Sequence, residues 1–411
     1  MRNRIPGAGK AGRMLITPEN GDASFYATVT MADDPAEEGT PLVKETLLTD
    51  ATEVNLFGNV ADRTVNEALN HIGTRLYQIA ERIAAITVTV KDSGGHAIPN
   101  VLVSGVVDEA GNEMYTDATG TLRGFIAEGS QTISISKYAD IEDCSATFNV
   151  LSGESYTKNL VVTTRNFIHL TASASYRFSG NVSTVDVSVG GGGGGGASGG
   201  ANSGDYSGGG GGGGGGYCTV KTGIVPTPNA MYSAIVGAGG AGGDPSWYGG
   251  GAPTSGAGTS GGVSSFMGVS ANGGSGGSGR SGGAGNGKGG NGGSNQASGG
   301  TYAASGTNGS SGSNRLYTSF TDSVVYGGGG GGGGEVSASG YASSIASGAG
   351  YGGNGGKASA ASSSVGAENG TSVYGGGGGG GALYWPADAA YSGGDGGSGS
   401  VSFRMHLKSA A

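Results

Sequence analysis

Apolar residues between positions 65 and 86 recur at alternating spacings of four and three, which predicts an amphipathic helix with a heptad repeat. Thr64 followed three residues later by Glu67 is the signature of a capping box at the helix start. Leucine at the a positions with isoleucine at the d positions favours three or four strands over two. We therefore expect residues 61–86 to form a short parallel homotrimeric coiled coil; an amphipathic helix packed on its own domain is the alternative. The seam has Leu69, Leu76 and Ile83 at a, and Val65, Ile72, Ile79 and Ile86 at d.

Residues 87–164 contain short alternating stretches rich in Val, Ile and Thr, which are typical of half-buried strands. Clusters of Asp, Asn, Ser and Gly separate them and predict turns. Short strands at this spacing favour a small β-sandwich, which we expect to act as a spacer. The expected strands are 86–90, 101–107, 131–137, 146–150 and 158–163, and the expected turns are 92–95, 108–112, 117–120, 128–130 and 152–154.

Beyond residue 165 the chain alternates between strand-like clusters and stretches of glycine. All but 15 of the 96 glycines lie beyond residue 179, so side-chain packing cannot hold this part together. Reading each glycine stretch as one pass between two ends of a domain puts most aliphatic residues at one end, the base, and polar or aromatic loops at the other, the tip. Residues 273–314 are too uniform to trace. The assigned passes are 190–196, 208–216, 237–243, 327–334, 348–356, 375–381 and 393–400, and the tip loops are 197–207, 244–254, 335–347 and 382–392.

Uninterrupted glycine can form an extended three-residue helix that rises about 3.1 Å per residue and makes no internal hydrogen bonds. Packed side by side, such helices can hydrogen-bond to several neighbours, and a Cβ at a packed face would push those neighbours apart. We therefore expect residues 165–411 to form a domain of packed polyglycine II helices with a small β base. A flexible low-complexity linker is the alternative, although linkers have no reason to begin and end on strands.

Bulky aromatic residues fall in the expected tip loops. Aromatic side chains on loops held by a rigid scaffold offer a large contact area at a small entropy cost, as a recognition surface needs. The candidate binding residues are Tyr206, Trp247, Tyr248, Tyr341, Tyr384, Trp385 and Tyr391.

Charge and composition narrow the functional classes. The chain carries a formal net charge of −9, almost all of it before residue 180, and has no basic cluster, which argues against binding to nucleic acid or an anionic membrane. No stretch approaches the ~18 apolar residues of a membrane span, and the start MRNRIPGAGKAG lacks the apolar core of a secretory signal. Cys144 and Cys218 lie far apart in different expected domains and are expected to be free thiols.

Catalytic and metal-binding motifs find little support. Glycine patterns of the nucleotide-binding type arise by chance at this composition, and neither Gly7–Lys10 nor Gly287-Lys288 is followed by the Ser or Thr of a P-loop. The four histidines are scattered one per segment without metal-ligand spacing. We expect no enzyme activity, no cofactor and no metal.

Residues 1–60 are expected to attach the chain to a larger assembly, beginning with strand-like stretches at 13–17 and 25–30 and a short helix at about 41–51. The segment GRMLITPENGDASFYATVTMADDPAEEGTPLVKETLLTD resembles the N-terminus of tail proteins in phages and prophages, largely of Gram-positive hosts. ITVTVKDSGGHAIPNVLVSG, TDATGTLRGF and SQTISISKYAD resemble carboxypeptidase-regulatory-like and bacterial Ig-like repeats.

The glycine-rich part resembles a further group of phage proteins. VDVSVGGGGGGG, GIVPTPNAMYSAIVGAGGAGG and GGDGGSGSVSFRM are similar to the glycine-rich domain of many phage tail proteins, with an architecture like the tip adhesins of T-even-like phages. In those adhesins, packed polyglycine helices present loops that bind a bacterial surface receptor. They are separate tip subunits, whereas here all segments share one chain.

The resemblance implies a homotrimeric virion tail fibre or receptor-binding protein, assembled in the host cytoplasm. Its N-terminus would bind other tail or baseplate proteins, and its aromatic tip loops would bind a bacterial surface glycan or protein non-covalently. The alternatives are a purely structural tail or baseplate component and a surface-polysaccharide depolymerase.

Overall fold

The structure is a computed structural model, and the chain falls into two units, residues 1–81 and 82–411. In the first unit, β1 (Arg13–Ile16) pairs antiparallel with β2 (Phe25–Thr28), as the sequence predicts. The helix expected near 41–51 lies outside the described residues. The structure describes residues 13–16, 25–28, 64–80, 82–202, 206–246, 253–287, 303–336, 343–357, 366–372, 374–384 and 389–408.

Helix α3 (Val65–Ala80) begins at the predicted capping box. The backbone N–H of Thr64 donates to the Glu67 carboxylate at 2.6 Å, and the N–H of Glu67 donates to the Thr64 hydroxyl at 3.2 Å. Two of the seam residues, Leu69 and Leu76, are each 62% exposed, so the apolar face of the helix is uncovered within one chain.

The helix ends six residues earlier than the heptad spacing predicts. Ile83 and Ile86 lie in strand β3 (Ile83–Asp92), so their assignment to a coiled-coil seam is wrong, and the helix does not extend to residue 86. The two isoleucines fit a heptad, but the stretch Ala84, Ile86, Val88, Val90 is buried at every second residue, and that alternation determines the structure. Val65, Ile72 and Ile79 remain on the helix.

The second unit begins with a β domain (residues 83–162) whose strands follow the order β8-β7-β4-β6-β3-β9, with β5 paired to β4. β3 and β9 are parallel, and the other pairs are antiparallel. The core holds buried residues from both ends of this order, such as Val150 from β8 and Leu160 from β9. The remaining strands are β4 (Leu102–Val107), β5 (Glu113–Tyr115), β6 (Thr121–Ala127), β7 (Gly129–Ile135), β8 (Cys144–Val150) and β9 (Ser155–Val162).

Three turns of the β domain share one construction, Asp-x-x-Gly-x. In each, one carboxylate oxygen of the aspartate accepts the N–H groups two and four residues later, at 2.8–3.0 Å. In each, the glycine three residues after the aspartate has a φ between +71° and +84°, a conformation that L side chains rarely adopt. The turns begin at Asp92, Asp108 and Asp117, as the sequence predicts.

The base of the glycine-rich domain is a four-stranded sheet in the order β10-β25-β12-β15. Alternate residues of β12, such as Val185, Val187 and Val189, are fully buried against Phe266 and Phe403. Two hairpins and one strand pair complete the base. The bounds are β10 (Phe167–Leu170), β11 (Ala174–Tyr176), β12 (Val182–Gly190), β15 (Cys218–Ile224), β16 (Tyr232–Ala234), β17 (Ser264–Phe266), β18 (Val269–Ala271), β20 (Arg315–Tyr317), β21 (Ser323–Val325) and β25 (Ser400–Leu407).

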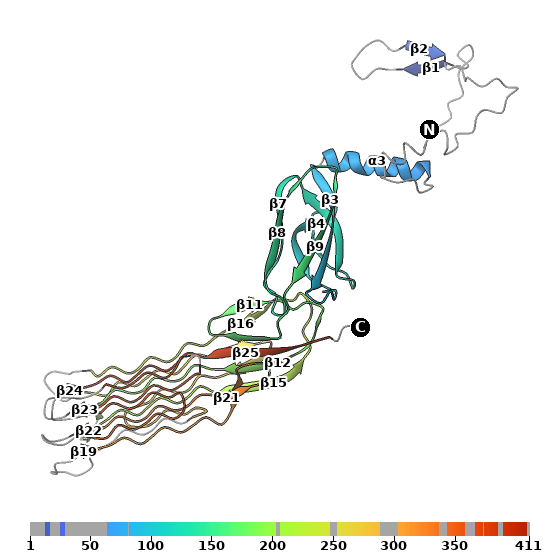
Figure 1. The fold of residues 1–411 in the computed structure, drawn as a ribbon. Helices are drawn as coiled ribbons and strands as arrows, with labels where there is room; N and C mark the ends of the chain where they lie inside the picture. The colour runs from blue at the N-terminus through green and yellow to red at the C-terminus, as the bar shows by residue number, and fades with distance from the viewer. Residues whose placement is uncertain are drawn as a thin grey trace. The chain divides into compact units, whose positions relative to one another are not determined.

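Between base and tip the chain runs back and forth in extended segments that lie side by side (Figure 1). We call these segments together the glycine bundle. Their described residues are 190–199, 208–217, 237–246, 253–263, 272–287, 305–314, 327–334, 343–357, 366–372, 374–382 and 391–399.

The segment 191–199 shows how the bundle is held. Its successive backbone N–H groups donate to three different segments in turn, at 2.8–3.0 Å, and the sequence of partners repeats every three residues. Gly191 and Gly194 donate to the 208–217 segment, and the residues after each donate to the 253–263 and 391–399 segments. Its carbonyl groups accept from three further segments, through Gly240, Gly274 and Gly378. Six neighbours therefore surround it, and all its residues are buried.

Only glycine fits inside this arrangement. A Cβ placed on Gly193, Gly194, Gly195 or Gly196 would lie 2.0–2.1 Å from a carbonyl oxygen of a neighbouring segment. Those contacts are with backbone, which cannot move aside as a flexible side chain can. The uninterrupted glycine runs are therefore the interior of the bundle.

The path agrees with the predicted passes except between residues 343 and 372. Residues 366–372, which were not predicted as a pass, lie antiparallel to 351–356 through the Glu368 and Thr371 N–H groups. The pass assigned to 348–356 is two passes: residues 343–349 lie along 327–334 in the opposite direction, the chain reverses at Gly350 (φ +56°), and 352–356 lie along the same run in its own direction. The sequence could not locate this reversal because Gly350 is one glycine among many. The untraced stretch also has a path: residues 273–277 and 282–287 flank a turn at the Ser278–Ser281 bridge.

Tyr326 closes the base end of the bundle. Its fully buried ring lies against the α-carbons of Gly190 and Gly375, and its hydroxyl donates to the Gly191 carbonyl at 2.9 Å. Burial raises the pKa of this phenol. Gly327, the next residue, has a φ of +72°, which turns the chain from the β21 strand into the extended segment.

Hydrogen bonds join the β domain to the glycine-rich domain. Buried Asp140 accepts from both the N–H and the hydroxyl of Ser179, at 3.0 and 2.5 Å, and burial raises the pKa of its carboxyl. The Tyr138 hydroxyl donates to the Asn229 side chain at 2.5 Å, and the Gly180 N–H donates to the Pro99 carbonyl at 2.8 Å.

Candidate functional site

The far end of the glycine bundle is the first candidate site, because several segments reverse there within a small structured platform. Four short strands form a mixed sheet in the order β19-β22-β23-β24, in which β22 and β23 are parallel. A hairpin, β13 with β14, lies at the same end. The bounds are β13 (Gly200–Asn202), β14 (Tyr206–Gly208), β19 (Ala303–Ala304), β22 (Glu335–Val336), β23 (Leu383–Tyr384) and β24 (Ala389–Ala390).

Three of the predicted binding residues have a described backbone at this end. Tyr206 lies in β14 opposite Asn202, and Tyr384 lies in β23 opposite Ala389. Tyr391 is half-buried; its N–H donates to the Ala382 carbonyl and its carbonyl accepts from Gly199. The predicted residues Trp247, Tyr248, Tyr341 and Trp385 lie outside the described residues.

Short hydrogen-bonded pairs hold the stems of the tip loops. Ser246 and Thr254 bond to each other through both backbone and side chains, closing the loop between them. The Ser392 hydroxyl donates to Asp244 at 2.7 Å, joining the stems of two loops that are far apart in sequence. The loops therefore leave the bundle from fixed positions.

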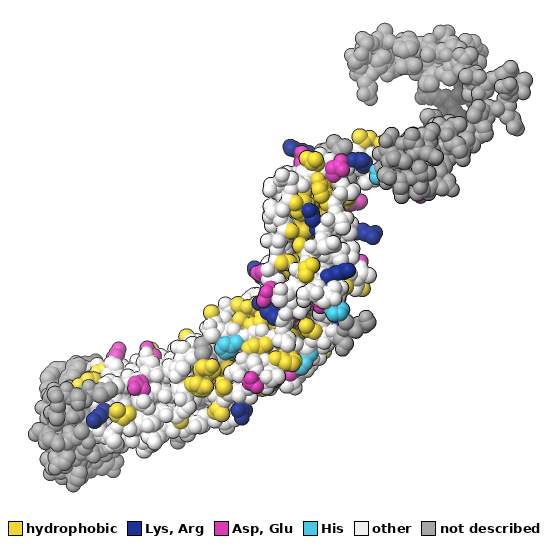
Figure 2. All heavy atoms as spheres, viewed as in Figure 1, with side chains coloured by type: hydrophobic (Ala, Val, Ile, Leu, Met, Phe, Trp, Pro, Cys, Tyr) yellow, Lys and Arg dark blue, Asp and Glu magenta, His cyan; other side chains and the backbone are white. Residues whose placement is uncertain are grey.

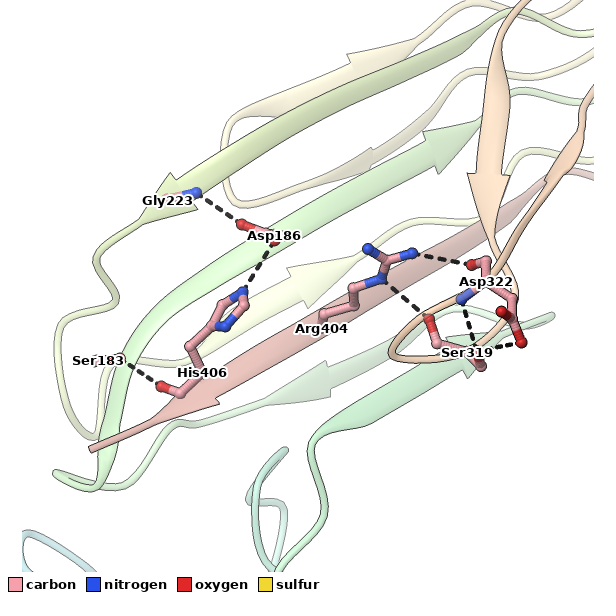
Figure 3. Close-up of polar contacts among 7 residues, drawn as sticks. All are labelled: Ser183, Asp186, Gly223, Ser319, Asp322, Arg404 and His406. Atoms are coloured by element: carbon pink, nitrogen blue, oxygen red, sulfur yellow. Dashed lines mark hydrogen bonds and ion pairs between the residues drawn. The ribbon is translucent and has the colours of Figure 1, made fainter. Parts of the chain in front are cut away.

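A second polar cluster lies on the outer face of the base sheet (Figure 3). Asp186 of β12 accepts the Gly223 N–H at 2.9 Å and lies 3.0 Å from Nε2 of His406. Beside it, Arg404 donates to the carbonyls of Ser319 and Asp322, both at 3.0 Å.

Ring contacts complete the cluster and show its structural role. The Arg404 guanidinium lies 3.4 Å from the centre of the Tyr317 ring, and Phe320 packs edge-on to His406 with ring centroids 5.5 Å apart. The Ser183 hydroxyl donates to the backbone carbonyl of His406 and not to its ring. Among the described residues, no nucleophile is in line with the Asp–His pair, and the contacts join the β20–β21 hairpin to β25.

His169 and the two cysteines are hydrogen-bonded or at least partly buried. His169 bonds to the Ser402 hydroxyl at 2.7 Å, and burial lowers the pKa of its imidazole. Both cysteines are free, as the sequence predicts; burial raises the pKa of the Cys144 thiol, and that of Cys218 to about 11. A thiol with a raised pKa is a weak nucleophile.

A cavity of about 650 Å³ lies between the β domain and the glycine-rich domain. Its polar groups are paired with each other: His96 with Asp92 at 3.0 Å, and Lys408 with the Gly180 carbonyl at 2.7 Å. Over the described ranges, no three His, Cys, Asp or Glu side chains gather as metal ligands, and no helix has the length and apolar content to cross a membrane.

The surface of the bundle carries few charges. On the face in view, the extended segments present mostly small polar and backbone atoms, whereas apolar and charged side chains gather over the base and the β domain (Figure 2). The bundle side is thus a poor candidate for charge-based recognition, which leaves the tip as the better candidate.

Two comparisons with known proteins bear on the chain. Residues 170–406 match a family model described as a glycine-rich domain. No curated protein matches the sequence. The matched range begins at the end of β10 and runs into β25, so it covers nearly all of the base, the bundle and the tip.

Proposed function

We propose that this chain, which belongs to the glycine-rich domain family, is a tail fibre or receptor-binding protein of a phage or prophage. The resemblance of its N-terminal and glycine-rich segments to phage tail proteins supports the proposal. It would bind a bacterial surface glycan or protein non-covalently through the aromatic tip loops. The observation that carries the proposal is the separation of the two ends: the bundle is held by backbone hydrogen bonds along its length, and its loops leave one end from paired stems.

Polyglycine II helices are the conformation we propose for the extended segments. The threefold repeat of hydrogen-bond partners in residues 191–199 supports it, because a helix with three residues per turn directs successive N–H groups to three sides. A bundle of this kind would hold its loops rigidly, so that aromatic side chains could bind without first losing much freedom.

The β domain is proposed to be an Ig-like or carboxypeptidase-regulatory-like spacer. Its repeated Asp-x-x-Gly turns and short strands support this reading. Residues 1–60 are proposed to attach the chain to other tail or baseplate proteins of the virion.

Helix α3 is proposed to hold three copies together as a short coiled coil. Leu69, Ile72 and Leu76 are 62%, 39% and 62% exposed, and a helix with such a face gains stability from burying it against identical partners. Three copies would also raise a modest single-site affinity through effective concentration.

Whole-cell binding tests the receptor-binding role. The purified trimer would be labelled and incubated with a panel of Gram-positive and Gram-negative bacteria, and retention would be measured by flow cytometry. Trp247→Ala combined with Trp385→Ala is expected to abolish retention on the cells that bind the parent protein. Tyr217→Ala, which removes a 41% exposed aromatic at the base end, is the matched control and is expected to bind normally.

Each alternative predicts a different result. Undiminished retention by the tryptophan double variant would favour a purely structural tail component. Release of reducing sugar ends from envelope polysaccharide would favour a depolymerase.

Oligomeric state is a separate measurement. Leu69→Ser with Leu76→Ser is expected to lower the mass in sedimentation velocity from three chains to one. Asn66→Ser, on an exposed part of the same helix, is expected to leave it unchanged. Equal masses for parent and double variant would rule out α3 as the trimerisation element.

A further inference from the structure

We propose that a side chain at every third position of the outer segments limits the glycine bundle to one chain, and that replacing these side chains by glycine would let a second copy of this chain add to the bundle. The proposal concerns self-association and does not depend on what the tip binds.

In several outer segments an exposed side chain recurs at every third position. In the segment 237–246, Ala238, Ala241 and Asp244 are exposed, whereas the glycines between them are buried or half-buried. Neighbouring segments repeat the pattern. The corresponding exposed residues are Ala257, Ser260 and Val263; Asn272, Ser275 and Ser278; and Ser392 and Asp395.

Interior segments differ only in lacking those side chains. The run 190–196 is glycine throughout, is buried throughout, and has a neighbouring segment on every side. A segment with glycine at every third position can therefore take another segment against that side. A segment with a side chain at those positions cannot, so the bundle stops there. The distances give the reason: interior neighbours approach so closely that a Cβ would lie about 2 Å from their carbonyl oxygens.

Side chains of the outer segments, which we call the rim, also accept hydrogen bonds from backbone N–H groups of neighbouring outer segments. Asp395 accepts the Gly242 N–H at 2.7 Å, and Asn369 accepts the Asp395 N–H at 2.8 Å. Asn308 accepts the Ser347 N–H at 2.8 Å. These N–H groups would otherwise be open to the carbonyls of another glycine segment, as the free edge of a β-sheet is open to another strand.

One face of the bundle offers a suitable place for the test. Segments 237–246 and 253–263 are neighbours, joined by the Gly262 N–H to the Ala238 carbonyl and the Thr259 N–H to the Ala241 carbonyl. Their exposed residues at the threefold positions, Ala238 and Ala241 on one and Ala257 and Ser260 on the other, therefore lie on adjacent segments. Thr259 is also exposed, and its hydroxyl accepts the Ala241 N–H at 2.7 Å.

The test replaces these four residues by glycine in the full-length protein: Ala238→Gly, Ala241→Gly, Ala257→Gly and Ser260→Gly. Sedimentation velocity over a range of concentrations is expected to show at least a doubling of the parent mass. The matched control, Ala238→Ser, Ala241→Ser, Ala257→Ser and Ser260→Ala, keeps every Cβ and is expected to retain the parent mass. A lysine-tagged hexaglycine peptide is expected to bind the glycine variant and not the control.

Two outcomes would overturn the proposal. One is a glycine variant that keeps the parent mass and does not bind the peptide; the other is equal association by variant and control. Slow deuterium exchange at residues 190–196 verifies that the bundle of each variant is intact. If exchange there is fast in the fourfold variant, Ala238→Gly with Ala241→Gly makes the same comparison with half the added flexibility.

Discussion

The β domain and the glycine bundle are both closely packed, but different atoms lie at their centres. In the β domain, alternate side chains such as Ile86 and Ile133 meet in a core, and the backbone hydrogen bonds connect strands around it. In the bundle the buried atoms are the backbone itself, and hydrogen bonds run to neighbours on all sides. The first arrangement tolerates changes of side chain on its surface, whereas the glycine runs of the second leave no room for a Cβ. The buried side chains of the bundle, such as Ala197 and Ala382, come after the glycine runs in their segments.

The largest expected effect comes from adding side-chain atoms inside the bundle. Gly194→Val would place a Cβ 2.1 Å from the Ser275 carbonyl oxygen, and we expect it to destabilise the bundle by about 5 kcal/mol or more. Thiol labelling during urea unfolding measures each region separately, because Cys144 lies in the β domain and Cys218 beside the bundle. Early labelling of Cys218 alone is the expected result.

Ala241→Val is the control for that experiment. It adds the same kind of atoms at an exposed position of an adjacent segment and is expected to leave Cys218 protected. Similar labelling in both variants would contradict the difference between interior and rim.

Removing side-chain atoms from Tyr326 tests the packing at the base end of the bundle. Tyr326→Ala is expected to destabilise the glycine-rich domain by about 4 kcal/mol, because it opens a cavity beside Leu316 and Cys218. Tyr326→Phe keeps the ring and loses only the bond to Gly191, for which about 1 kcal/mol is expected. Thermal melts of the two variants measure both effects, and equal losses would mean that the hydroxyl, not the ring, matters.

A core substitution in the β domain tests the helix boundary as well. Ile86→Ala is expected to destabilise that domain by about 3 kcal/mol and to leave the oligomeric mass unchanged, since Ile86 is 2% exposed within β3. Thr87→Ala, the next residue along the strand, faces the other side and is the control. A lower oligomeric mass for Ile86→Ala would contradict the helix boundary and indicate that Ile86 belongs to the proposed coiled-coil seam.

Lowering the pH is expected to give the smallest difference in stability between the β domain and the glycine bundle. Side-chain hydrogen bonds from Asn112 and Thr119 hold the pKa values of Asp108 and Asp117 below their ordinary value of 3.8. The stability that these turns supply is therefore complete above pH 3.8 and is lost as the pH falls through the lower folded-state values. Protection factors, which correct hydrogen exchange for its intrinsic pH dependence, are expected to fall first in the β domain below pH 3.8, and Asp108→Asn with Asp117→Asn is expected to flatten that dependence.

The sequence predicts the features that depend on only a few neighbouring residues. The Asp-x-x-Gly turns, the capping box and the alternation of base and tip all follow from a few neighbouring residues. Strand β6 was missed because Arg123 and Gly124 interrupt its alternation, and the end of α3 was missed because Ile83 and Ile86 satisfy two periods at once.

The bundle shows a different limit. Its interior could be anticipated, since only glycine allows such close contact, but which segments are neighbours depends on contacts between residues far apart in the chain, such as Gly193 with Gly397. The sequence nevertheless held a signal that went unused. The repeat GAGGAGGD at 237–244 marks an outer segment, because its non-glycine residues recur at every third position and are the exposed ones.

The threefold repeat of hydrogen-bond partners also restricts how this domain can change in length during evolution. Inserting one or two residues in a segment would rotate every later residue onto a different side and bring Ala or Asp into the interior. Inserting three preserves the assignment of sides and moves a tip loop outward by about 9 Å at 3.1 Å per residue. Related chains that reach farther from their base are therefore expected to differ from this one by triplets, added together in segments that lie next to one another.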